Sequence, residues 1–468
     1  MMRELGATTK MATLKDLGTW RGGGTPSKSN PAFWAEGTIP WVTPKDMKVF
    51  RIGDSEDRIT PEAVDQSSAS LVSGPSVAVV VRSGILQRTL PVAVVQLDAT
   101  FNQDMKALQP KDGVRPEYVA YYLRGFERDI LASCSKNGTT VASIDFARFH
   151  AYPIPLPSFE EQKQIVDEIE TQFARLDDAV AALQRARTRL KRYRASVLKA
   201  ACEGRLVPTE AELALREGRD YEPASVLLDR IKAEREANAG KKRGKTNQMS
   251  VPDALALPEL PEGWVWTNLS ELLAVPLSNG RSVPTAEVGF PVLRLTALVN
   301  GTIDLTKRKI GRWTEAEASR FLVTGGDFLV SRGNGSLRLV GRGGLVPDNP
   351  DRVAFPDTLI RVRAIGWAIA PKFLANMWNS GLVRERIERS ARTTAGIYKV
   401  NQTDLSNVQL PLPPRDEQER IVTEVERRLS VIEQLETTVE TNLKRGEALR
   451  QSILRMAFRG RLVPTGEK

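Results

Sequence analysis

The sequence contains a single histidine, His150, and two cysteines, Cys134 and Cys202, among 468 residues. One histidine and two distant cysteines cannot build the usual zinc sites. A Ser-His-Asp mechanism would depend on His150, which lies close to a proline-rich segment, so we interpret it as a surface or interface residue. We expect both cysteines to be free thiols in a reducing cytoplasm.

Long apolar runs are also missing. No stretch approaches 18 consecutive apolar residues, and the N-terminus lacks the apolar core of a signal peptide. We therefore expect a cytoplasmic protein that does not associate with membranes.

The length and charge give two positive indications. A chain of 468 residues is longer than one hydrophobic core normally supports, so we expect more than one domain. The formal net charge of +10 is consistent with a polyanionic partner without proving one.

A stretch of about 55 residues occurs twice. Pro155 corresponds to Pro411 and Pro208 to Pro464, with an offset of 256 residues in both cases. Loops tolerate changes of length, whereas long paired helices do not. The constant offset therefore indicates a rigid element of fixed length.

Each copy predicts one long helix. Pro157 ends the extended chain before it, and Ser158 is a candidate N-cap. A helix over 158–202 would be about 67 Å long at 1.5 Å per residue. Apolar residues follow with heptad spacing, which is typical of a coiled coil: Ile169, Phe173, Leu176, Val180, Leu183, Leu190 and Val197 in the first copy, and Val425, Leu429, Ile432, Val439, Leu443 and Ile453 in the second.

Two such helices most simply pair with each other, although packing on unrelated domains remains an alternative. Arg187, Arg194, Glu436 and Gly446 occupy heptad positions, and we expect them to weaken the seam.

Short strand patterns and a few helices indicate a mixed α+β (α/β) fold on either side of the first long helix. The second globular region repeats the order of elements of the first, so the chain is a tandem repeat with an expected pseudo-two-fold arrangement. We predict a first domain over 1–157, a long helix over 158–204, a connector over 205–260, a second domain over 261–412 and a long helix over 413–468.

Residues 239–246 fit a relaxed Walker A pattern. A phosphate-binding loop of that kind follows a strand and opens a helix, whereas this segment follows a charged helix and leads to Pro252. We therefore do not interpret it as a nucleotide site, and we find no convincing catalytic group elsewhere.

The remaining signal is that of a DNA reader. Basic and amide side chains occur in glycine-rich loops at corresponding places in both globular regions. Arginine contacts guanine, asparagine contacts adenine and lysine suits phosphates, although any one of these residues is more often a solvated loop charge. The candidates are Arg82, Arg88, Asn102, Lys136, Asn137 and Arg148, and then Arg332, Asn334, Arg338, Arg342, Arg392 and Lys399.

A basic run also marks the first long helix. It is either a solvated face, a surface beside the spacer of a bound duplex, or a partner-docking surface. The run consists of Arg185, Arg187, Arg189, Lys191, Arg192 and Arg194.

Several motifs together resemble the DNA-specificity (S) subunit of type I restriction–modification systems. They are the paired Pro-Leu-Pro and Glu-Gln segments, residues 24–26, 39–43, 102–104 and 138–140, and the Leu-Pro-Glu-Gly-Trp stretch at 260–264. The resemblance covers nearly the whole chain. The second domain departs from it at 290–294, where the Pro-Trp form is absent.

This resemblance implies two target recognition domains separated by two antiparallel helices, each domain reading one half of a bipartite, asymmetric target in double-stranded DNA. It also implies a non-enzymatic subunit without a cofactor of its own. Modification subunits would bring S-adenosylmethionine, and a restriction subunit, if one is present, would bring ATP-driven activity. For docking two modification subunits we predict Glu161, Gln162, Ile165, Glu417, Gln418 and Ile421.

Two other functions remain open from the residues alone. One is a structural adaptor whose domains bind proteins and whose basic charge is incidental. The other is a nucleotide-dependent enzyme that uses residues 239–246.

Overall fold

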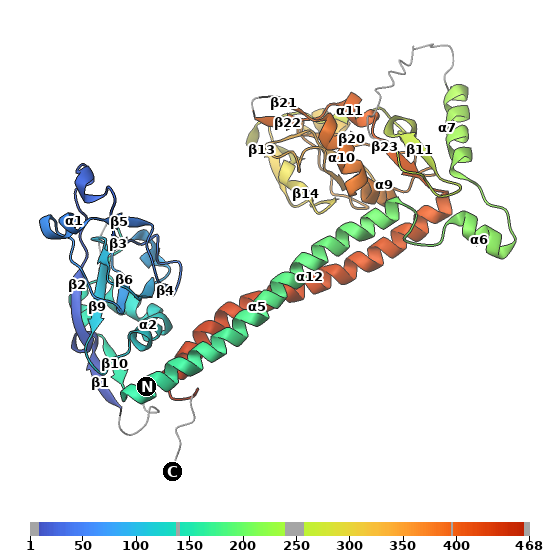
Figure 1. The fold of residues 1–468 in the computed structure, drawn as a ribbon. Coiled ribbons are helices and arrows are strands. Elements are labelled where there is room, and N and C mark those ends of the chain that lie inside the picture. The colour runs from blue at the N-terminus through green and yellow to red at the C-terminus, as the bar shows by residue number, and fades with distance from the viewer. Residues whose placement is uncertain (1–8, 137–140, 239–256, 395, 463–468) are drawn as a thin grey trace. The chain divides into compact units, whose positions relative to one another are not determined.

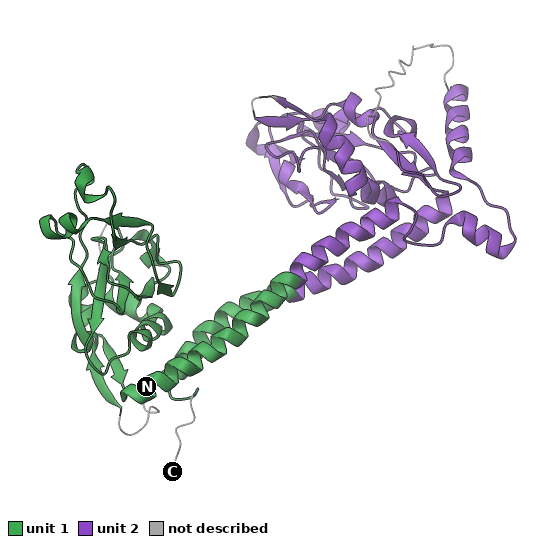
Figure 2. Cartoon of the chain, in the orientation of Figure 1, with its two compact units in different colours: residues 1–185, 439–468 green, residues 186–438 purple. Residues whose placement is uncertain are grey.

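The computed structural model describes residues 9–136, 141–238, 257–394 and 396–462 (Figure 1). By contacts the chain forms two compact units, residues 1–185 with 439–468, and residues 186–438 (Figure 2). This division passes through both long helices, so each unit contains one mixed domain and part of each helix. The predicted domain boundaries follow the order of the chain, whereas this division by contacts groups segments that are far apart in the sequence.

The first unit contains three sheets. Its five-stranded sheet has the order β2-β9-β6-β7-β4, and the smaller ones are β5-β3-β8 and β1-β10. The strands are β1 Lys10–Thr13, β2 Gly18–Gly22, β3 Ile39–Val42, β4 Arg51–Ile52, β5 Asp57–Ile59, β6 Ser76–Val80, β7 Val92–Val95, β8 Thr100–Phe101, β9 Met105–Pro110 and β10 Pro153–Leu156. The shorter helices are α1 Pro61–Gln66, α2 Pro116–Gly125, α3 Glu127–Cys134 and α4 Phe146–His150.

Strand β6 is the centre of this unit. All five of its residues are buried, and it pairs antiparallel with both β7 and β9. Val77 and Val79 belong to the core that contains helix α2, whereas Ala78 and Val80 belong to the core on the other face of the sheet. The apolar run therefore forms a strand that is covered on both faces.

The second unit contains a second mixed domain, built around a central sheet of its own. Its main sheet has the order β12-β20-β17-β19-β15-β14, beside sheets β13-β16, β18-β22-β21 and β11-β23. The strands are β11 Val265–Asn268, β12 Ser278–Asn279, β13 Thr285–Leu293, β14 Leu298–Val299, β15 Thr302–Ile303, β16 Arg308–Gly311, β17 Phe328–Ser331, β18 Gly333–Asn334, β19 Gly343–Leu345, β20 Leu359–Val362, β21 Arg392–Thr394, β22 Ile397–Lys399 and β23 Gln409–Leu412. The shorter helices are α6 Glu210–Glu217, α7 Ala224–Asn238, α8 Glu315–Ala318, α9 Pro371–Trp378, α10 Gly381–Ser390 and α11 Gln402–Ser406.

Strand β17 corresponds to β6, and helix α9 to α2. Phe328 and Val330 face the core that contains α9, and Leu329 faces the opposite core. Both helices begin with a proline at their first position, Pro116 and Pro371, where the missing N–H costs nothing. The predicted repeat of mixed domains is confirmed.

The two predicted long helices are continuous. They are α5, Phe159–Cys202, and α12, Arg415–Ala457. In the first unit the beginning of α5 packs against the end of α12, since Asp177 forms an ion pair with Arg450. In the second unit the end of α5 packs against the beginning of α12, since Arg194 contacts Glu433 at 3.6 Å. Both pairings are antiparallel.

Three of the four residues that we expected to weaken the seam contribute to it instead. Arg194 donates a hydrogen bond of 3.2 Å to Glu436, so two heptad positions with opposite charge compensate each other. Gly446 is buried, and a Cβ added there would lie 3.2 Å from Val180, so glycine permits a close approach of the helices.

Each long helix also ends in a globular core. The last turn of α12 brings Leu454 and Ala457 into the core of the first unit, and Phe458 directly after the helix joins them. The Phe458 ring lies 5.2 Å from those of Tyr118 and Tyr122 on α2, in edge-on contacts. The last turns of α5 likewise place residues 197, 201 and 202 in the core of the second unit.

Both cysteines are free and buried. Burial raises the pKa of the Cys202 thiol to about 12. Within the described part of the chain, no helix has the length and apolar character that a membrane span requires.

Replacing Phe458 with alanine tests the contact between α12 and the first domain. We expect Phe458→Ala to lower the free energy of unfolding of that domain by about 3–5 kcal/mol, because a 3% exposed aromatic ring leaves a cavity. Urea unfolding followed by circular dichroism measures this effect. The control Met456→Ala, two residues earlier at a position that is 36% exposed, should cost about 0.5 kcal/mol or less. Equal losses of unfolding free energy in the two variants would contradict a core position for Phe458.

Candidate nucleic-acid interface

Four of the predicted reader residues of the second unit gather at one small sheet. Strand β18 pairs with β22, and β22 with β21, so that Lys399 lies opposite both Gly333 and Arg392. Arg332 precedes β18, and its carbonyl accepts a hydrogen bond of 3.0 Å from Val400 N. Asn334 belongs to β18 itself.

Arg392 and Lys399 form a cross-strand pair of like charge. Both side chains are exposed, and directly opposite positions of an antiparallel pair hold side chains on the same face. Like charges at such positions destabilise a sheet. An anion bound across the strands would remove this cost, so the sheet is suited to a phosphate-bearing partner.

Arg338 and Arg342 lie in the loop between β18 and β19. Arg342 Nε donates a hydrogen bond of 2.9 Å to the carbonyl of Arg338, and both side chains are exposed. A supporting residue that the sequence pattern did not reveal is Arg384 on α10. It is 7% exposed and donates a hydrogen bond of 2.7 Å to the carbonyl of Val340 inside this loop.

In the first unit the structure brings three of the predicted residues together. Arg82 follows β6, forms an isolated bridge with Ser143, and donates through its backbone to the carbonyl of Asp104 at 3.2 Å. Lys136 N donates to the carbonyl of Ser143 at 2.9 Å. Asn102 begins the turn that contains Asp104.

The other predicted residues of this unit lie apart from that group. Arg88 follows a short 3-10 helix, Gly84–Gln87, and Arg148 lies on α4, 3.8 Å from Asp145. Asn137 lies outside the described residues.

The asparagine candidates remain predictions, and each has a hydrogen-bond partner within its own turn. The side-chain oxygen of Asn102 accepts a hydrogen bond of 2.8 Å from Asp104 N, and that of Asn334 accepts one of 3.0 Å from Ser336 N. Both asparagines stabilise their own turns, as asparagine commonly does two residues before an N–H group. In the first unit the exposed residue of this turn is the next one, Gln103.

At the start of each long helix, where we predicted a docking surface, a buried glutamine is hydrogen-bonded to the backbone of the adjoining domain. Gln162 accepts a hydrogen bond of 2.9 Å from Arg115 N and donates to the carbonyls of Gly113 and Pro157, both at 3.0 Å. Gln418 makes the same three bonds to Ala370 N and to the carbonyls of Ala368 and Pro413, at 2.8, 3.0 and 3.1 Å. We call each set of three bonds a glutamine anchor.

Both glutamines are fully buried, as are Ile421 and Glu417, and Ile165 is 6% exposed. Side chains that are enclosed and hydrogen-bonded within their own domain present no surface to a partner. For these five residues the structure therefore corrects the docking prediction, because they attach each helix to its own domain.

Glu161 and Glu417 occupy corresponding positions and have different partners. Glu161 accepts hydrogen bonds from the backbone N and hydroxyl of Ser158, at 2.9 and 2.8 Å, as a capping box does. The residue that corresponds to Ser158 in the second copy is Pro414, which has no hydroxyl. Glu161 is half-buried and remains a docking prediction.

Glu417 instead connects the connector to the second domain. It accepts hydrogen bonds from Trp264 Nε1 at 2.9 Å and from Glu210 N at 2.8 Å. Burial raises the pKa of Glu417, against the effect of these two donors. Glu210 forms ion pairs of 2.6 Å with Arg219 and with Arg420.

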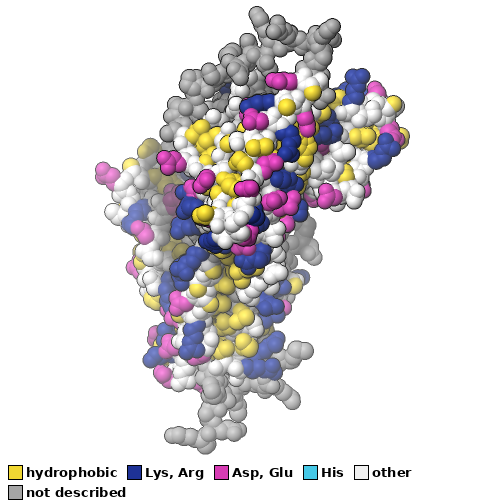
Figure 3. Space-filling model, turned by 90° about the vertical axis from the view of Figure 1, so that its right-hand side faces the viewer, with side chains coloured by type: hydrophobic (Ala, Val, Ile, Leu, Met, Phe, Trp, Pro, Cys, Tyr) yellow, Lys and Arg dark blue, Asp and Glu magenta, His cyan; other side chains and the backbone are white. Residues whose placement is uncertain are grey.

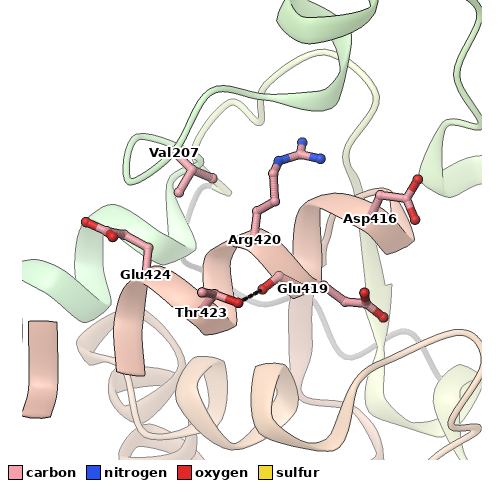
Figure 4. A pocket seen from close by; sticks show the side chains of 6 residues that line it. All are labelled: Val207, Asp416, Glu419, Arg420, Thr423 and Glu424. Carbon is pink, nitrogen blue, oxygen red and sulfur yellow. Dashed lines mark hydrogen bonds between the residues drawn. The ribbon is translucent and has the colours of Figure 1, made fainter. Parts of the chain in front are cut away.

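An open groove of about 500 Å³ lies beside this network (Figure 4). Val207 and α12 residues line it, and Arg420 extends toward the connector while Asp416, Glu419 and Glu424 bring negative charge. Thr423 donates a hydrogen bond of 2.9 Å to the carbonyl of Glu419. This acidic groove is not suited to DNA.

Other charges are mixed. The face shown in Figure 3 carries basic and acidic side chains interspersed. In the basic run of α5, Arg194 forms ion pairs with acids of α12, whereas Arg185, Arg189, Lys191 and Arg192 are exposed.

Other predicted chemistry falls outside the site. His150 is half-buried on α4, with its ring 4.1 Å from that of Phe146. Within the described residues, no group of three or more His, Cys, Asp or Glu side chains could hold a metal ion. Residues 239–246 lie outside the described residues.

Two mixed domains with cationic loops, together with paired long helices, are the arrangement expected of a two-part nucleic-acid reader. A family model for the type I restriction modification DNA specificity domain matches residues 7–181. The EcoR124I/EcoR124II specificity subunit of Escherichia coli is 44% identical over 158 residues, which are 34% of this chain and 39% of that protein. The StySPI specificity subunit of Salmonella potsdam is 30% identical over 368 residues, which are 78% of this chain and 69% of that protein.

The chain therefore belongs to the family of type I restriction enzyme specificity subunits. Solved structures agree in fold. The HsdS subunit of Thermoanaerobacter tengcongensis has a TM-score of 0.55 at 18% identity, with 98% of both chains covered. A chain from a study of complex assembly and conformational transition in a type I R-M system has a TM-score of 0.63 at 18% identity, with 98% of this chain and 99% of that chain covered.

The internal role of Gln162 can be measured. We expect Gln162→Ala to lower the free energy of unfolding of the first unit by about 1–3 kcal/mol, because buried backbone groups lose their partners. The matched control is Gln164→Ala, since Gln164 is exposed on the same helix. Thermal unfolding of the two variants would contradict the anchor role if their midpoints were the same.

Proposed function

We propose that this chain gives a type I restriction–modification complex its DNA specificity by reading a bipartite, asymmetric target. Each mixed domain reads one half of the target through its cationic loops. The two long helices set the number of base pairs between the halves.

The observation that carries this proposal is the cross-strand pair Arg392 and Lys399, with Arg332, Arg338 and Arg342 in the neighbouring loops. Five exposed cations on this sheet and its loops are complementary to the negative charge of a DNA backbone. The first domain supports the proposal with Arg82 and Lys136. Arg82 follows β6 as Arg332 follows β17, and Lys136 follows α3 as Arg392 follows α10.

The partners follow from the family. We infer that the chain assembles with two modification subunits that carry S-adenosylmethionine and methylate the DNA, and that it has no catalysis or cofactor of its own. ATP-dependent restriction subunits are expected partners where the system contains them.

Salt dependence tests the phosphate contacts. We expect the double variant Arg392→Ala/Lys399→Ala, assembled with its modification subunits, to bind duplex DNA more weakly and to lower the slope of log K against log salt by roughly 2, about one for each lost contact. Fluorescence anisotropy at several salt concentrations measures the slope. The control is Arg389→Ala on α10, where the side chain is paired with Glu385 at 2.9 Å. An unchanged slope in the double variant would remove the sheet from the interface.

Helix length tests the spacing. Duplicating one heptad in each helix, residues 179–185 and 439–445, keeps the seam in register and adds about 10 Å. We expect unchanged half-site sequences separated by a gap about three base pairs longer, because each base pair adds about 3.4 Å. Mapping of methylated sites in a host with the extended subunit measures the gap. Changed half-sites at a constant gap would disprove this role of the helices.

A further inference from the structure

One turn has the same backbone hydrogen bond in both domains and a different polar side chain at its second position. In the first domain it spans residues 102–105, and Met105 N donates to the carbonyl of Asn102 at 3.0 Å. In the second it spans residues 356–359, and Leu359 N donates to the carbonyl of Pro356 at 3.0 Å.

The same two neighbours support both turns. The first is a glycine: Gly23 N donates to the carbonyl of Met105 at 3.2 Å, and Gly280 N to that of Leu359 at 3.3 Å. A Cβ on either glycine would collide with two carbonyl oxygens of the turn or of the residue before it, so only glycine fits.

The second neighbour is an arginine that follows the central strand. Arg82 N donates to the carbonyl of Asp104 at 3.2 Å, and Arg332 N donates to that of Thr358 at 2.9 Å. These equivalences place Gln103 of the first domain and Asp357 of the second at the same position, directly before the residue whose carbonyl the arginine contacts.

Gln103 is exposed and Asp357 is half-buried. The Thr25 hydroxyl donates a hydrogen bond to Gln103 Oε1, which orients the amide with its N–H groups still available. In the sequence of the second domain, Ser282 stands two residues after Gly280, as Thr25 stands two residues after Gly23.

We propose that Gln103 and Asp357 each read one base, Gln103 an adenine in the first half-site and Asp357 the amino group of a cytosine in the second. A carboxamide matches the donor and acceptor of adenine in the major groove, whereas a carboxylate only accepts and so matches the cytosine N4 amine. A carboxylate would repel a phosphate, so a backbone contact does not explain Asp357. This inference rests on the proposed DNA reading by both domains.

The test uses the full chain assembled with its modification subunits and a pool of randomised DNA duplexes, from which bound molecules are selected and sequenced. We expect Gln103→Ala and the isosteric Gln103→Glu to change the preference at one base pair of the first half-site, by roughly 10- to 100-fold, and to leave the second half-site unchanged. Asp357→Ala and Asp357→Asn should change one base pair of the second half-site alone.

The controls are Gln164→Ala and Asp348→Asn, both at exposed positions elsewhere in the same units, which should leave every preference unchanged. Urea unfolding checks each variant, and where an alanine variant is unfolded, the isosteric variant decides. Unchanged preferences in the Gln103 and Asp357 variants, or a uniform loss of binding at all positions, would overturn the inference while DNA specificity stands. A wild-type complex that selects no sequence would instead overturn the proposed function.

Discussion

The glutamine anchor is the constraint on which the rest of the structure depends. A helix of 44 residues and another of 43 leave their domains at Pro157 and Pro413, where each chain could take many directions. In both units a buried amide holds the loop before the neighbouring helix and the proline two residues before the long helix at the same time. Because an unsatisfied buried amide is costly, the exit direction of each long helix is fixed by its own domain.

Much of the fold could be predicted because it depends on periodicity. The offset of 256 residues and the heptads identified both helices and placed their first residues to within a residue or two of those of α5 and α12. The predicted range 413–468 extends past the end of α12 at Ala457, because the repeated sequence continues beyond the helix. The quality of the seam could not be predicted, because a heptad position shows the residue type without its partner. Arg194 and Glu436 each look unfavourable alone and compensate each other as a pair. Gly446 looks like a gap in the seam, but its lack of a side chain lets the two helices approach each other closely at Val180.

The candidate site was predictable in outline only. Loops between strands can be located from composition, and the cations of β21 and β22 were among the predicted residues. Which side chain of a loop is exposed depends on the conformation of its turn. The sequence therefore indicates Asn102 as a base-reading candidate and does not show that its oxygen is bonded to the backbone of Asp104. For the same reason Gln162 and Gln418 resemble a repeated surface motif in the sequence. Only the folded chain shows that both are buried, and that they recur because both domains use the same internal hydrogen bonds.

The anchor also bears on how such proteins change over generations. Its six hydrogen bonds all reach backbone groups of the domains, and none depends on a domain side chain. A gene segment that encodes an unrelated recognition sequence could therefore be exchanged by recombination, and the new domain would still attach to the old helix. Target preference can diversify in this way in a single genetic event, without any compensating change in the framework that carries it.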